Sequence, residues 1–203
     1  MTRSAAAERL AAAFAERGCP VCRCLDADAR RDLAAYLREM TMDAGGRAAL
    51  RATGGFCAWH TALLRDAVDG ILSVALLAGE LLDVDLARRV SCGACRALRD
   101  RADAYVIALL DEPVAWRDAR GLPCRPHLRR LRAIGPDPIA VGAAEEAVAR
   151  RVIRLRAGLA AFVAKQDYRR RDPPTTEEAE AWSEALEHLS GRPAIFGSEI
   201  GRP

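Results

Sequence analysis

The chain has 203 residues, of which 51% are hydrophobic and 5% aromatic, and its formal net charge at pH 7 is +3. This length allows one ordinary domain or two small ones, and the hydrophobic fraction excludes wholesale disorder. Alanine, leucine and arginine dominate, which favours helices over strands. The longest apolar run, at 71–79, is far shorter than the ~20 residues that a membrane span requires.

The seven cysteines indicate a compartment and a chemistry. Charged residues interrupt the N-terminal stretch at 5–17, so it lacks the apolar region of a secretory signal. A reducing cytoplasm is therefore expected, where thiols more often hold metal or do redox chemistry than form structural disulfides. The odd number of cysteines also argues against complete disulfide pairing.

The sequence pattern in the first half of the chain predicts three helices. After a CxxC motif at 19–22, apolar residues recur at helical spacing through 25–40. Glycines then punctuate the segment at 44–55, which predicts a loop. Further helices are expected over about 59–68 and 71–82, on either side of an Asp-Gly pair.

The second half repeats this order and ends in an additional helix. Apolar residues predict a helix over 98–109, and a longer one over 148–162, where they step by 4, 3, 4 and 3. A capping-box-like start at 175–178 opens a last helix that extends to about 189. No segment alternates convincingly between apolar and polar residues, so the predicted fold class is all-α.

An internal duplication explains this order. Residues 19–37 match 92–110 at an offset of 73, and residues 54–65 match 121–132 at an offset of 67. The six-residue difference falls in the loop between the two blocks, where length changes cost little. The expected divisions, within one compact domain overall, are a first helical repeat at 1–90, a second at 91–171, and a C-terminal helix and tail at 172–203.

Each repeat carries a complete set of zinc ligands. Structural zinc sites take four ligands in a tetrahedron, commonly three cysteines and one histidine. CxxC supplies two thiolates from one turn, and CxxH supplies a thiolate and an imidazole that neighbour each other on a helix. The predicted metal ligands are Cys19, Cys22, Cys57, His60, Cys92, Cys95, Cys124 and His127.

The two CxxC and two CxxH motifs can combine into two metal sites in three ways. Sequential pairing closes one site within each repeat, and we expect it because the loops are short. The alternatives are swapped pairing, in which Cys19 and Cys22 join Cys124 and His127, and a Cys₄ site beside a Cys₂His₂ site.

Zinc, at two ions per chain, is the expected metal, but other roles for the thiols remain open. Iron–sulfur clusters accept the same thiolates, and histidine can replace one cysteine. A metal-free redox pair is less compatible, because the CxxC motif lacks a βαβ context. Buried free cysteines would not explain the repeated spacings. Cys24 has no counterpart in the second repeat and is interpreted as a small helix residue, or alternatively as a reactive thiol beside the first site.

Several other features receive structural interpretations. His188 is interpreted as a surface histidine rather than a ligand, and Trp59 and Trp116 as core residues. The cationic segment 165–171 suits the C-terminal end of a helix. The arginine-rich region 117–171 carries 14 basic and 5 acidic residues, which is compatible with a polyanion surface but more often marks a solvated, ion-paired face.

The motifs also resemble a known family. The pattern CPVCR…GFCAWH…CGACRAL…LPCRPHL, followed by KQDYR and a late tryptophan-bearing helix, is similar to an uncharacterised bacterial domain-of-unknown-function family with two CxxC…CxxH units. The resemblance covers most of the chain, and the cysteine–histidine spacings are its specific part. It implies metal binding at these motifs and no particular activity.

The expected function is an interaction or regulatory protein with two structural zinc sites. Four protein ligands leave no open coordination position, and no HExxH, P-loop or GxSxG motif is present, so the sequence does not indicate an enzyme. An iron–sulfur electron carrier is the main alternative, and a nucleic-acid-binding protein is a weaker one. The expected partner is another protein or a second copy of the chain, and no interaction with a membrane is expected.

Overall fold

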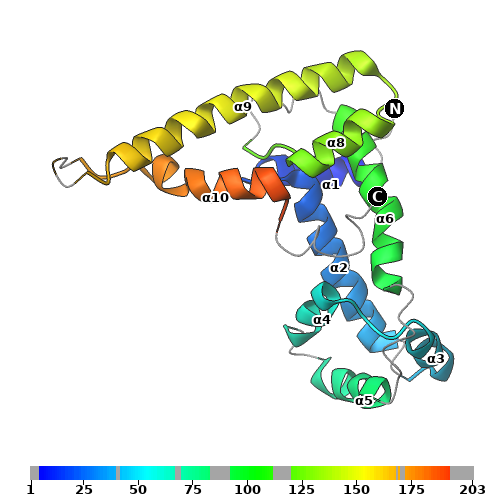
Figure 1. The fold of residues 1–203 in the computed structure, drawn as a ribbon. Coiled ribbons are helices and arrows are strands. Elements are labelled where there is room, and N and C mark those ends of the chain that lie inside the picture. Colours follow the sequence, from blue (N-terminus) through cyan, green and yellow to red (C-terminus); the bar gives the residue numbers. More distant parts are fainter. Residues whose placement is uncertain are drawn as a thin grey trace. The chain divides into compact units, whose positions relative to one another are not determined.

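The computed structural model describes residues 5–39, 42–66, 70–82, 92–111, 120–167, 169 and 172–192. Regular structure in these ranges is helical, apart from an isolated bridge between Gly18 and Gly121, so the all-α prediction is confirmed. No helix in this part of the chain combines the length and hydropathy needed to cross a bilayer. In chain order the elements are α1 (Ala5–Phe14), α2 (Pro20–Glu39), α3 (Ala44–Ala52), α4 (Ala58–Arg65), α5 (Ile71–Leu82), α6 (Gly93–Ala108), the 3₁₀ turn η3 (Leu109–Asp111), α8 (Arg125–Ile134), α9 (Pro138–Ala164) and α10 (Thr176–Ser190) (Figure 1).

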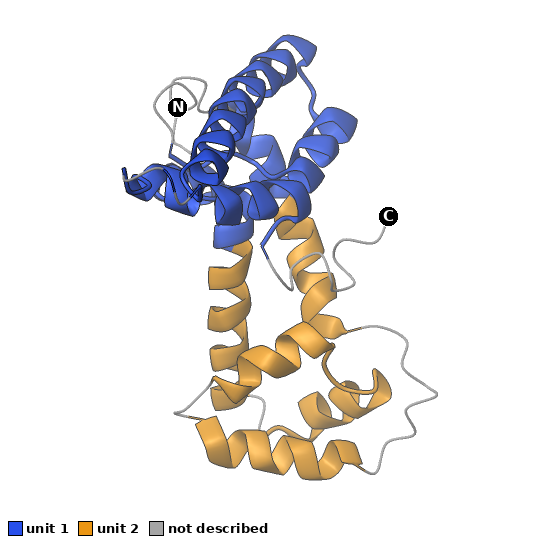
Figure 2. Cartoon of the chain, turned by 60° about the vertical axis from the view of Figure 1, so that its left-hand side comes forward, with its two compact units in different colours: residues 1–24, 103–193 blue, residues 25–102, 194–203 orange. Residues whose placement is uncertain are grey.

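The helices form two compact units (Figure 2). Unit 1 comprises Met1–Cys24 and Asp103–Pro193, and unit 2 comprises Leu25–Ala102 and Ala194–Pro203. Helices α2 and α6 contribute residues to both units. Each unit therefore combines segments from both sequence repeats.

Unit 1 is built around the long helix α9. The predicted apolar stripe of this helix supplies Val148 and Leu155 to the core, together with Leu10, Leu109 and Leu131 from α1, η3 and α8. The chain after α1 is fixed by a backbone hydrogen bond of 3.1 Å from the Gly121 N–H to the Phe14 carbonyl. This contact holds the segment before the first CxxC motif against the segment before the second CxxH motif.

Helix α10 packs with its polar face rather than its apolar stripe. The stripe at Trp182, Leu186 and Leu189 is 53%, 57% and 52% exposed, whereas Ala181 is buried. Ala181 lies opposite Gly158 of α9, where an added methyl group would stand only 3.3 Å from its Cβ. Small residues at this crossing allow close approach of α9 and α10, and the larger apolar side chains face solvent.

Unit 2 contains a buried carboxylate between helices α2 and α6. Leu25 and Leu98 are fully buried, and Asp28 beside them is 1% exposed. The Asp28 carboxylate accepts a hydrogen bond of 2.7 Å from Arg31 and lies 3.6 Å from the Arg101 guanidinium. Burying a charge is costly unless it is paired, so these arginines compensate for removing Asp28 from water.

The variant Asp28→Ala is expected to lower the free energy of unfolding by about 1–3 kcal/mol, because two cations lose their buried partner. Both arginines are partly exposed, so water limits the loss. Chemical denaturation of the full-length protein measures the effect. The variant Asp26→Ala, which removes a more exposed carboxylate that pairs with Arg30 on the same helix, serves as control and should change stability by less than about 0.5 kcal/mol. Equal effects of the two variants would contradict the assigned role of Asp28.

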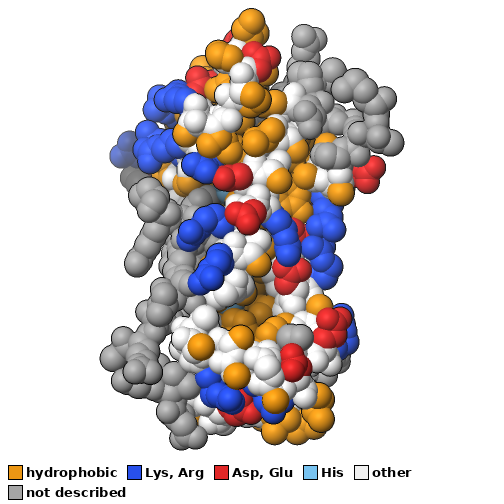
Figure 3. All heavy atoms as spheres, turned by 90° about the vertical axis from the view of Figure 1, so that its right-hand side faces the viewer, with side chains coloured by type: hydrophobic (Ala, Val, Ile, Leu, Met, Phe, Trp, Pro, Cys, Tyr) orange, Lys and Arg blue, Asp and Glu red, His pale blue; other side chains and the backbone are white. Residues whose placement is uncertain are grey.

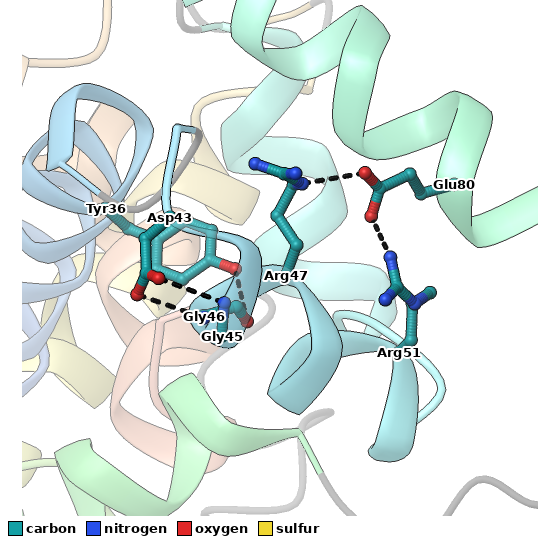
Figure 4. Close-up of polar contacts among 7 residues, drawn as sticks. All are labelled: Tyr36, Asp43, Gly45, Gly46, Arg47, Arg51 and Glu80. Carbon is teal, nitrogen blue, oxygen red and sulfur yellow. Dashed lines mark hydrogen bonds and ion pairs between the residues drawn. The ribbon is translucent and has the colours of Figure 1, made fainter.

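The prediction of a loop at 44–55 was wrong for its first part, because residues Ala44–Ala52 form helix α3. Asp43 caps this helix, and its carboxylate accepts hydrogen bonds from the backbone N–H groups of Gly45 and Gly46 at 2.9 and 3.0 Å (Figure 4). Arg47 and Arg51 on the following turns both reach Glu80 of α5. A strong N-cap and ion pairs to a neighbouring helix thus outweigh the low helix propensity of two glycines.

Candidate metal centres

All four cysteine-bearing motifs lie at helix N-termini. Cys57 and Cys124 are the N-cap residues of α4 and α8, with backbone angles that agree within a few degrees (φ −70, ψ 168 and φ −69, ψ 162). Cys19 and Cys92 directly precede α2 and α6. The second cysteine or the histidine of each motif follows in the first helical turn. Local helix geometry therefore presents two donor atoms per motif on one side of each helix end.

The first cluster lies within unit 1 and joins the N-termini of α2 and α8. It consists of Cys19, Cys22, Cys124 and His127, whose donor atoms all lie within 4.8 Å of one another. The His127 Nδ1 atom lies 3.4, 3.5 and 3.2 Å from the Sγ atoms of these cysteines, in chain order. The Sγ atoms of Cys22 and Cys124 are 3.8 Å apart. All four residues are buried.

The second cluster lies within unit 2 and joins the N-termini of α4 and α6. It consists of Cys57, His60, Cys92 and Cys95, and it has the same dimensions. The His60 Nδ1 atom lies 3.2, 3.6 and 3.4 Å from the three Sγ atoms, in chain order. The Sγ atoms of Cys57 and Cys95 are 3.5 Å apart.

The sequential pairing expected from the sequence was wrong. The structure groups the CxxC motif of each repeat with the CxxH motif of the other, which is the swapped arrangement. The physical reason is the course of the chain before each motif: the segments that precede Cys19 and Cys124 are bonded to each other through Phe14 and Gly121. Tertiary contacts of this kind outweigh the small entropic advantage of a shorter loop.

The spacing of the donor atoms matches one tetrahedral metal ion. Bonds of about 2.3 Å to sulfur and about 2.0–2.1 Å to nitrogen place sulfur atoms about 3.8 Å apart, and sulfur and nitrogen about 3.5 Å apart. The distances in both clusters lie close to these values. Hydrogen bonding alone does not explain them, because a ring nitrogen has one donor or acceptor position and each Nδ1 here contacts three sulfur atoms. The sulfur separations also exceed the ~2.05 Å of a disulfide.

The electrostatics of the clusters favour a bound cation. Among the protein groups alone, the pKa of Cys95 is raised by its hydrogen bonds to Cys57 and Cys92, by burial and by the negative charge of those thiols. Burial lowers the pKa of His60, but hydrogen bonds and charge from Cys57 and Cys92 outweigh it and raise the pKa to about 9. A divalent cation bound by these residues would replace the protons and remove the repulsion among thiolates. Two helix N-termini at each cluster further stabilise the thiolates.

The histidine of the second cluster has an orientation that suits ligation through Nδ1. Its Nε2 atom is buried and has no hydrogen-bond partner within the described residues. The Trp59 ring packs on the imidazole with a centroid distance of 4.5 Å, and Trp59 is buried as expected. This aromatic contact and the α4 backbone hold the ring with Nδ1 directed at the three sulfur atoms.

The remaining candidate residues lie outside both clusters. Cys24 is buried in α2, in agreement with its interpretation as a small helix residue. His188 is half-buried rather than a surface residue, and burial, followed by the charge of Arg125, lowers its pKa. Lys165 caps the end of α9 and binds Glu178 at 2.8 Å. The expectations for Trp116 and for Tyr168, Arg170 and Arg171 fall outside the described residues.

Comparison with family models, curated proteins and solved structures gave no match for this chain. The resemblance to an uncharacterised bacterial family therefore stays a prediction that rests on the motifs.

Proposed function

We propose that this protein binds two zinc ions, one in each Cys₃His cluster, and that the ions hold its helices together. The observation that carries the proposal is the position of each histidine Nδ1, which lies 3.2–3.6 Å from three sulfur atoms at once. A shared tetrahedral ion accounts for four buried donor atoms at these separations.

The complete donor sets support a structural role for the metal. Catalytic zinc usually has three protein ligands and keeps one position for water or substrate, whereas each cluster here supplies four. The ligand residues are also buried, so a substrate would have little access to the ion. A role in organising an interaction or regulatory protein fits these sites better than catalysis.

The compactness of each cluster favours a single ion over an iron–sulfur cluster. In an iron–sulfur cluster the protein ligands bind different iron atoms and surround a core that also contains sulfide. Here all donor atoms of a set lie within 4.8 Å of one another. Tetrahedral sites of this ligand type suit zinc.

Metal analysis tests this proposal. Protein purified under reducing, anaerobic conditions is expected to contain about two zinc ions per chain and to be colourless. The variant Cys24→Ala should retain both ions, because Cys24 belongs to neither cluster. Less than one metal ion of any kind per chain would refute the proposal, and iron with broad visible absorption would replace it with the electron-transfer alternative.

The surface supports a protein partner more than a nucleic acid. Large apolar side chains are exposed on α5 and α10, including Leu72, Leu82 and Leu186. In contrast, several arginines of the basic region are paired with carboxylates, as in Arg130–Asp103 and Arg132–Glu145. On the face shown in Figure 3, basic and acidic side chains are intermixed. We therefore propose a second protein or a second copy of the chain as the partner, with nucleic-acid binding as the weaker alternative.

A further inference from the structure

The C-terminal end of α10 contacts both cysteines of the first CxxC motif. The backbone N–H of Cys19 donates a hydrogen bond of 3.1 Å to the Glu187 carboxylate. The backbone N–H of Arg192 points at the Cys22 Sγ atom from 3.5 Å. A region of the chain about 170 residues away in sequence thus holds the turn that carries two donor atoms.

The same end of α10 also reaches the second ligand turn of this cluster. His188 lines a small cavity together with Cys19 and with Leu122, which lies two residues before Cys124. Residues 187–192 therefore contact the first ligand turn and line a cavity beside the second, and we call them the latch.

Two glycines allow the latch to lie against the first cluster. Gly18 has φ +90, and a Cβ atom at this position would lie 2.5 Å from the Glu187 carboxylate oxygen. Gly191 ends α10 with φ +78, which redirects the chain so that the next N–H faces Cys22. A residue with a side chain would be strained at either position, so the backbone conformation favours glycine there.

Polar contacts hold α10 in place. Glu184 forms two hydrogen bonds with Arg151, at 2.6 and 2.7 Å, and both side chains are mostly buried. Glu178 binds Lys165, and Glu180 pairs with Arg17. Since the large apolar side chains of α10 face outward, the docked position of the latch depends on these acidic residues.

We infer that Glu187 is a positioning residue for the first metal site, and that the latch controls how fast that site releases its ion. The carboxylate fixes the Cys19 backbone, and the Arg192 N–H stabilises the Cys22 thiolate when metal is bound. The inference rests on the proposed function, because it presumes that the first cluster holds zinc. The second cluster belongs to unit 2, so it serves as an internal reference.

The test measures zinc release from the full-length, zinc-loaded protein into excess chelator. Removing a group that supports a metal ligand typically costs 10–100-fold in affinity. The variant Glu187→Ala is therefore expected to release one of the two ions about 10–100 times faster and to leave the other unchanged. Glu187→Gln keeps an acceptor oxygen but loses the negative charge, so its release rate should lie between those of the wild type and Glu187→Ala. Glu177→Ala removes an exposed acid from the same helix outside the latch and should change neither rate.

Cadmium-113 NMR assigns the affected site, because each cluster gives its own resonance. The variant Glu187→Ala should shift only the resonance that His127→Ala abolishes. An unchanged release rate and resonance in Glu187→Ala would overturn the inference, as would equal effects on both clusters or an equal effect of Glu177→Ala. If Glu187→Ala does not fold, Glu187→Gln decides by the same two measurements. Wild-type protein with less than one metal ion of any kind per chain would instead refute the proposed function.

Discussion

The double variant Cys19→Ser with His60→Ala is expected to lose both zinc ions, whereas Cys19→Ser with His127→Ala should retain about one. The first pair removes one ligand from each cluster, and the second removes two ligands from the same cluster. Both double variants exchange one thiol and one imidazole, so they are chemically matched. Metal content after dialysis against a moderate chelator gives the result.

The two variants together separate all three possible pairings. Sequential pairing would reverse the result, so that Cys19→Ser with His60→Ala retains one ion and the other double variant loses both. A Cys₄ site beside a Cys₂His₂ site would place Cys19 apart from both histidines, and both double variants would then lose both ions. Melting curves of each variant show whether the protein remains folded while metal content is measured.

The eight residues of the two clusters could be predicted from the sequence, but their pairing could not. Ligand identity follows from local spacing, since CxxC and CxxH at a helix N-terminus fix the relative positions of two donor atoms. Pairing depends on which helix ends meet, and the two copies of each motif are chemically equivalent. The loop from Cys22 to Cys124 spans 102 positions, against about 35 from Cys22 to Cys57. This difference costs only about 1 kcal/mol in closure entropy, so loop length is a poor guide.

The swapped arrangement also costs less loop-closure entropy than the length of the loop from Cys22 to Cys124 suggests. The second cluster joins residues only 32 positions apart, from His60 to Cys92. Once this inner site has formed, it shortens the effective loop that the outer site must close between Cys22 and Cys124. The two sites are therefore nested along the chain, and the inner one assists the outer one.

Helices that bury an apolar face could be predicted from the sequence. Helices whose formation or buried face depends on polar contacts were harder to predict. The stripe of α9 contains the core residues Val148 and Leu155, as its spacing indicated. The glycines at 45 and 46 suggested a loop, but the Asp43 cap converts them into a helix start. In α10 the stripe with Trp182 faces solvent, because the acidic face binds Arg151 and the first cluster instead. Periodicity reveals an amphipathic helix but not which face it buries.

Removal of both metal ions is expected to abolish much of the helical signal and the cooperative melting of this protein. Structural zinc contributes on the order of 10 kcal/mol or more per site, while the net stability of a domain is about 5–15 kcal/mol. Without a cation, each cluster leaves three thiols and an imidazole buried within 4.8 Å of one another. Strong chelation with mild heating, followed by circular dichroism at 222 nm and thermal melting, measures the loss. Readdition of zinc under reducing conditions should restore both signals.

The loss should begin at helix α4. This helix has eight residues, and an isolated helix shorter than about 12–15 residues is marginal in water. Its buried face includes His60 and Trp59, which pack at the second cluster, so the metal anchors it directly. Hydrogen exchange after partial metal removal should therefore show the amides of α4 losing protection before those of the 27-residue α9, whose N-cap at Asp137 and core contacts lie outside the clusters. Unchanged helicity and melting temperature after verified removal of both ions would show that the clusters do not hold this fold together.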